Sequence, residues 1–128
     1  MSVTVKNQRP VNLDLGSLTF PPMAIASILH RISGLALFLL LPYMMYFLSI
    51  SLQSSEAFDH LQSVLRSPFN KLVLWAFSTA LAYHLLAGFR HIFMDIGFGE
   101  HLATARRSAI TVIAVAIVLA GFLGVWMW

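Results

Sequence analysis

The chain of 128 residues contains no cysteine and few charged side chains. Without cysteine it can hold no disulfide scaffold, no cysteine-type zinc site and no iron–sulfur cluster of its own. Only 10% of its residues are charged, whereas a soluble domain of ordinary composition carries about 25%. Hydrophobic residues make up 59% of the chain. Because too few polar side chains remain to cover a water-facing surface, the composition predicts an integral membrane protein.

Three apolar runs stand out, at residues 32–50, 72–89 and 108–128. Each approaches the roughly 20 residues that a helix needs to cross the hydrocarbon core of a bilayer. The fold class is therefore expected to be all-α, with three transmembrane helices in an up-and-down arrangement. The expected organisation is an N-terminal arm of residues 1–22, helices at about 23–52, 70–94 and 106–128, and polar connections between them.

The positive charges predict an orientation in the membrane. Six of the eight Lys and Arg residues fall at the N-terminus or near the second connection, and only Arg66 and Lys71 fall near the first. Positive residues concentrate on the cytoplasmic side, so the N-terminus is expected there. The same scattering gives no basic stripe, so nucleic acid is not an expected partner. Neither a cleavable signal peptide nor a transit segment is visible, which favours a bacterial chain or an already mature one. The expected location is the bacterial inner membrane, where lipid surrounds the helices.

His84 is the most informative single residue, because it lies inside the second apolar run. An ionisable side chain within the membrane needs a partner and marks a candidate functional site. One interpretation is a metal or haem ligand. The other is a structural histidine that is hydrogen-bonded to a neighbouring helix.

A stripe of polar and small residues extends from this position along one helix face. It occupies positions i, i+4, i+7 and i+11: His84, Gly88, His91 and Asp95. Gly88 would leave room for a flat macrocycle, although close helix packing explains such a glycine equally well. His91 and the adjacent Arg90 could meet haem propionates, although membrane topology alone would explain Arg90.

The start of the first apolar helix carries a second polar cluster. Ser27, His30 and Arg31 lie three or four residues apart and can share a helix face. A quinone head group needs hydrogen-bond donors at interface depth, and an arginine would stabilise negative charge on a reduced quinone. The alternative for Arg31 is a snorkelling charge that sets topology.

Two motifs resemble a known family. Residues 27–34 read Ser-Ile-Leu-His-Arg-Ile-Ser-Gly, and residues 84–97 read His-Leu-Leu-Ala-Gly-Phe-Arg-His-Ile-Phe-Met-Asp-Ile-Gly, after an N-terminal arm that contains Arg9-Pro10. The pair resembles the large cytochrome b membrane-anchor subunit of succinate dehydrogenase, the respiratory complex II that links the tricarboxylic acid cycle to electron transport. Phe89 is bulkier than the aliphatic residue expected there.

The resemblance implies a role for each matching residue. His84 would be an axial ligand of the iron of haem b, with His30 and His91 near the haem propionates. Ser27 and Arg31 would line the ubiquinone site. The Arg9-Pro10 arm would dock on the iron–sulfur subunit.

Partners are implied as well. Six-coordinate haem needs two strong ligands, and this chain has one histidine at depth, so the second ligand is expected from a smaller anchor subunit that shares the bundle. A flavoprotein with FAD and a subunit with iron–sulfur clusters would complete the enzyme, since this chain alone would not oxidise succinate. Two alternatives remain: the anchor of a fumarate reductase, and a haem-free structural membrane subunit.

Overall fold

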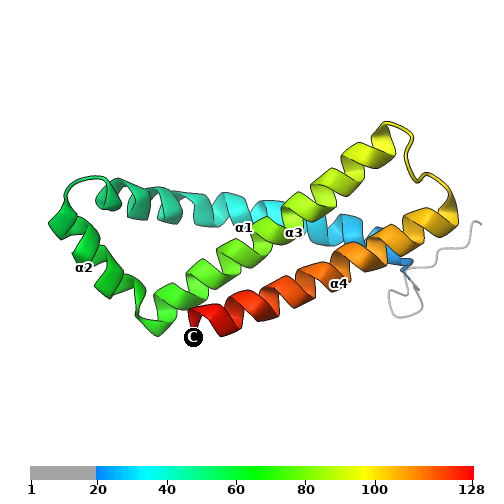
Figure 1. The fold of residues 1–128 in the computed structure, drawn as a ribbon. Helices are drawn as coiled ribbons and strands as arrows, with labels where there is room; N and C mark the ends of the chain where they lie inside the picture. Colours follow the sequence, from blue (N-terminus) through cyan, green and yellow to red (C-terminus); the bar gives the residue numbers. More distant parts are fainter. Residues whose placement is uncertain (1–19) are drawn as a thin grey trace, which may run out of the picture.

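The computed structural model describes residues 20–128, so the N-terminal arm with Arg9-Pro10 lies almost entirely outside the described residues. Four helices and no strand make up the described part: α1 (Pro22–Ser51), α2 (Ser55–Leu65), α3 (Pro68–Asp95) and α4 (Leu102–Met127) (Figure 1). Three of them, α1, α3 and α4, are long and apolar enough to cross a membrane. The expected all-α class with three candidate transmembrane helices is confirmed.

Proline and serine set where the helices begin. α1 and α3 each have a proline in their first turn, where the missing N–H would have no helical partner anyway. Ser67 also caps α3, since its hydroxyl accepts a hydrogen bond from the Asn70 backbone N–H at 3.3 Å. Ser54 caps α2 in the same way through the Ala57 N–H at 3.0 Å. Each cap pairs a backbone N–H that has no partner within its own helix.

α2 is an addition to the expected layout, which had only a polar connection at this place. Its partly or fully buried residues recur at i, i+4 and i+8: Ala57, Leu61 and Leu65. This spacing places them on one helix face, and α2 uses it to contact the ends of α1 and α3. The connection between two spans is therefore a short amphipathic helix.

The turn between α3 and α4 depends on two glycines. Gly97 and Gly99 have φ values of +91° and +80°, which side-chain-bearing residues rarely adopt. α4 then begins at Leu102, several residues before its charge-free run. The hydrogen-bonded helix continues past Arg106 and Arg107, because a helix does not have to end where the hydrocarbon ends.

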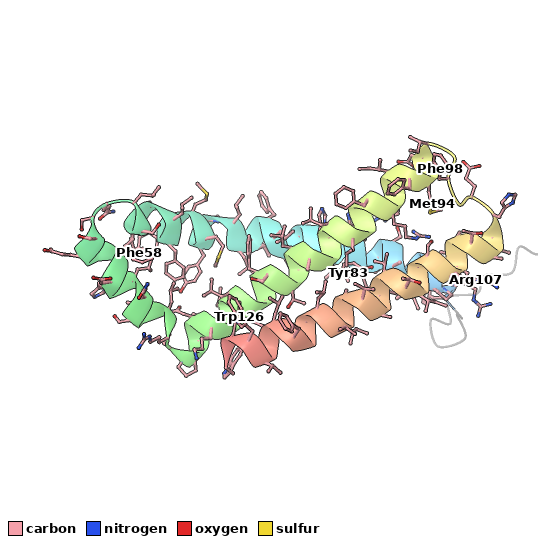
Figure 2. The ribbon with its side chains drawn as sticks, in the orientation of Figure 1. Phe58, Tyr83, Met94, Phe98, Arg107 and Trp126 are labelled. Carbon is pink, nitrogen blue, oxygen red and sulfur yellow. The ribbon has the colours of Figure 1, made fainter. Side chains whose placement is uncertain are left out.

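α3 is the central helix and packs against both α1 and α4 (Figure 1). The closest packing uses small side chains, which allow helix backbones to approach in a membrane. Ala26, Ala87, Ala105 and Ala109 are each at most 2% exposed. In Figure 2, Tyr83 lies in the middle of this packing, while Arg107 and Trp126 mark the two opposite ends of α4.

Two polar contacts fasten the helices to one another. The Trp75 indole N–H on α3 donates to the Ala120 carbonyl on α4 at 2.9 Å. The Tyr83 hydroxyl donates to the Ala26 carbonyl on α1 at 2.8 Å. Each of these hydrogen bonds pairs a polar side-chain group in an apolar environment, where an unpaired polar group would cost free energy. They fix the depth of α3 relative to its two neighbours.

Candidate functional site

Three histidines from two helices form a cluster. The His30 ring on α1 stacks on the His84 ring of α3, with centroids 4.2 Å apart and an angle of 22° between the planes. His91, two turns further along α3, lies 5.1 Å from His30 by the same measure and is tilted by 42°. The predicted α3 stripe and the predicted α1 cluster therefore meet at His30.

Ser33 is the polar contact that holds His84. Its hydroxyl oxygen lies 3.1 Å from Nδ1 of His84 and donates to the His30 carbonyl at 2.8 Å. The residue is only 7% exposed. Sequence reasoning did not single it out, although its position three residues after His30 was a usable signal, because a residue at i+3 lies on the same helix face.

Gly34 leaves the space that the His84 ring occupies. A Cβ atom at Gly34 would stand 3.1 Å from Cε1 of His84, which is closer than the roughly 3.5–4.0 Å optimum for carbon atoms. At Gly88 the corresponding distance, to Nε2 of His30, is 3.6 Å. Gly34 is thus the glycine on which the fit of His84 depends, and Gly88 faces His30.

His30 presents a buried nitrogen in need of a partner. Its Nε2 atom is shielded from solvent, and no hydrogen-bond partner for it lies within residues 20–128. An unsatisfied buried polar atom costs about 1–3 kcal/mol. A carboxylate brought in by a bound group, such as a haem propionate, would satisfy it.

The ring geometry also limits how the cluster could bind a metal. Two ligands of one ion must aim their nitrogen lone pairs at a common point, whereas His30 and His84 present their faces to each other. No group of three or more potential ligands for an ion was found among the described residues. His84 could offer a metal one ring nitrogen only, Nε2, because Ser33 engages its Nδ1.

Ser27 and Arg31, predicted to line a quinone site, lie one helical turn apart on α1. Ser27 is half-buried and Arg31 is exposed. The helix turns His30 inward against α3, so these two side chains flank the histidine cluster and are not part of it.

Arg90 does not have the surroundings that the propionate interpretation required. The residue is 8% exposed, and its Nε donates to the Ser108 hydroxyl at 3.0 Å. Its Nη2 donates to the Ala105 carbonyl at 3.1 Å. Arg90 joins α3 to α4, because both of its hydrogen-bond partners lie on α4.

Comparisons with known proteins agree on one family. The family described as succinate dehydrogenase/fumarate reductase transmembrane subunit matches residues 5–123. A protein of Coxiella burnetii named succinate dehydrogenase cytochrome b556 subunit is 48% identical over 122 residues, covering 94% of this chain and 98% of that protein. Proteins with the same name from Paracoccus denitrificans and Rickettsia typhi are 36% and 33% identical over 115 residues. They cover 90% of this chain and 88% and 90% of their own lengths.

Proposed function

Since the chain belongs to the transmembrane-subunit family of succinate dehydrogenases and fumarate reductases, we propose that it is the cytochrome b membrane anchor of a succinate dehydrogenase. In this role it binds haem b and forms part of the site where ubiquinone is reduced. The observation that carries the proposal is the His84 imidazole, held inside the apolar helix layer with one ring nitrogen engaged by Ser33. The names of the relatives, cytochrome b556 subunits, agree with a haem of the b type.

His84 is the proposed axial ligand, through Nε2. A second ligand would come from the smaller anchor subunit, because His30 lies face to face with His84 and the two rings cannot aim their nitrogens at one ion. His30 and His91 are proposed to meet the propionates, and the unpaired Nε2 of His30 supports this role. When bound, the haem supplies a site that accepts and returns single electrons.

Ser27 and Arg31 are proposed to bind the quinone head group. A serine hydroxyl and a guanidinium both donate hydrogen bonds to carbonyl oxygens, and the charge of Arg31 favours the oxygen as it gains electron density. The partner subunits would supply the FAD that takes two electrons from succinate and the iron–sulfur clusters that would carry them to ubiquinone, which is reduced with two protons. The present chain contributes binding, orientation and electrostatics.

The same proposal places the chain in the bacterial inner membrane with a cytoplasmic N-terminus. The start of α1, the end of α3 and the start of α4 lie at one end of the molecule (Figure 1). Arg106 and Arg107 lie at this end, and Arg66 and Lys71 at the other. The excess of positive charge at the first end supports a cytoplasmic location for it. The flavoprotein and iron–sulfur subunits would bind there.

A gentle purification of the chain with its partners tests the proposal. We expect flavoprotein, iron–sulfur and second anchor subunits to co-purify, with a b-type visible spectrum that appears on reduction with succinate. A colourless complex without these subunits would refute the proposal and favour the haem-free structural subunit. The family description also names fumarate reductase, so the complex should be assayed in both directions, with ubiquinone and with menaquinone.

A further inference from the structure

Ser33 differs from most other helical serines in what its oxygen does. Its hydroxyl donates to the carbonyl three residues back, as serines in helices often do. Four further serines make the same bond in the described part of the chain: Ser49, Ser51, Ser63 and Ser108. Ser33 also reaches a ring nitrogen on another helix, at 3.1 Å.

The direction of that second bond follows from counting protons. A hydroxyl has one proton, and in Ser33 it goes to the His30 carbonyl, which can only accept. With the hydroxyl proton on that carbonyl, the oxygen acts as the acceptor toward His84, which corresponds to the tautomer with the proton on Nδ1. A distance of 3.1 Å is within the ordinary range for an N–H···O bond.

Ser108 provides an internal precedent. Its hydroxyl donates to the Ala105 carbonyl at 3.0 Å, and its oxygen lies 3.0 Å from Nε of Arg90. The direction there is unambiguous, because a guanidinium can only donate. The same serine arrangement thus accepts an N–H of Arg90 from α3 and offers an equivalent acceptor to Nδ1 of His84.

We infer that Ser33 is the positioning residue for His84: it fixes the tautomer with the proton on Nδ1 and thereby directs the Nε2 lone pair to the haem iron. The inference rests on the proposed function, since it assigns a partner to the proposed ligand. A histidine that binds a metal generally donates its other N–H to an oxygen, which sets the ring orientation and makes the ligand more basic. The His30 ring stacks on the His84 ring, and Gly34 leaves space for it. Both contacts hold His84 where its Nδ1 atom can reach the Ser33 oxygen.

The expected consequence is a change in the redox behaviour of the haem. A more basic imidazole favours ferric over ferrous iron, so removal of the Ser33 oxygen should raise the reduction potential. Loss of such a partner changes metal affinity by about 10- to 100-fold. If the preference for ferric over ferrous iron changes about tenfold, the reduction potential of this one-electron couple shifts by about 59 mV.

The experiment is a redox titration of the haem in the purified four-subunit complex, followed optically, for the wild type and three variants. Ser33→Ala removes the acceptor, and Ser33→Thr keeps a hydroxyl at the same place. Ser49→Ala is the matched control, because Ser49 makes the same backbone bond at the other end of α1 without a histidine contact. Thermal stability is measured alongside for all four proteins.

We expect a raised potential or a loss of haem in Ser33→Ala, with wild-type behaviour in Ser33→Thr and Ser49→Ala. A Ser33→Ala complex with an unchanged potential and haem content would overturn the inference, even if its stability falls. Equal losses of haem in Ser33→Ala and Ser33→Thr would also overturn it, because the hydroxyl would then not be the cause. The proposed function fails separately, if the wild-type complex has no haem or if His84→Ala retains the normal spectrum.

Discussion

Replacement of Gly34 by alanine is expected to displace His84. The added Cβ atom would stand 3.1 Å from Cε1 and 3.5 Å from Nδ1 of the ring. Because carbon atoms prefer to be about 3.5–4.0 Å apart, the ring or the α1 backbone must move by about 0.4 Å or more. A movement of this size would stretch the 3.1 Å contact with Ser33 to the limit of a hydrogen bond.

The chain provides a matched control for this substitution. Alanine at Gly121 would meet nothing within 4 Å among the described residues. Both glycines lie inside helices, where alanine is favoured by about 1 kcal/mol. A difference between the variants therefore reports on the contact with His84 rather than on helix propensity.

The assay is the ratio of haem to protein in the purified complex, together with the reduced-minus-oxidised spectrum. We expect Gly34→Ala to bind haem about 10- to 100-fold more weakly or to shift its absorption band. Gly121→Ala should match the wild type. Normal haem content and spectrum in Gly34→Ala would refute the reasoning, because His84 would then not depend on the space at Gly34.

Two further substitutions test other parts of the molecule. Arg31→Ala should abolish or strongly slow quinone reduction and leave succinate oxidation with a soluble dye acceptor intact. Steady-state assays with the two acceptors measure both rates. Wild-type kinetics with quinone in this variant would rule out the proposed role of Arg31. Arg90→Met should lower the thermal stability of the detergent-solubilised complex, since hydrogen bonds from a charged group to Ser108 and Ala105 are lost at about 1.5–3 kcal/mol each. The haem spectrum of Arg90→Met should stay unchanged, and a large spectral shift would instead support the earlier propionate interpretation.

The three apolar helices were predictable from sequence, because hydrocarbon thickness dictates the length of a charge-free run. α2 was not predicted, although the spacing of Ala57, Leu61 and Leu65 indicates one buried helix face. A polar connection outside the membrane has no comparable length requirement, so its composition alone did not reveal a helix.

The site was partly predictable for a different reason. Helical periodicity places His84 and His91 on one face and groups His30 with Ser27 and Arg31 on another helix; the motif resemblance gave His30 its expected role near the haem. The structure adds how α1 and α3 pack together, which brings His30 against His84. Sequence could not assign Ser33 or Arg90, because their partners lie on other helices and depend on how the helices pack: Ser33 bonds His84, and Arg90 bonds Ser108 on α4.

The optical spectrum of a His84→Ala complex tests the central claim most directly. His60→Ala is a suitable control, since it removes an imidazole from α2, in the connection between the first two spans. Reduced-minus-oxidised spectra of the purified complexes should show the b-type bands in the wild type and in His60→Ala, and lost or altered bands in His84→Ala. An unchanged haem spectrum in His84→Ala, at full haem content, would contradict the account.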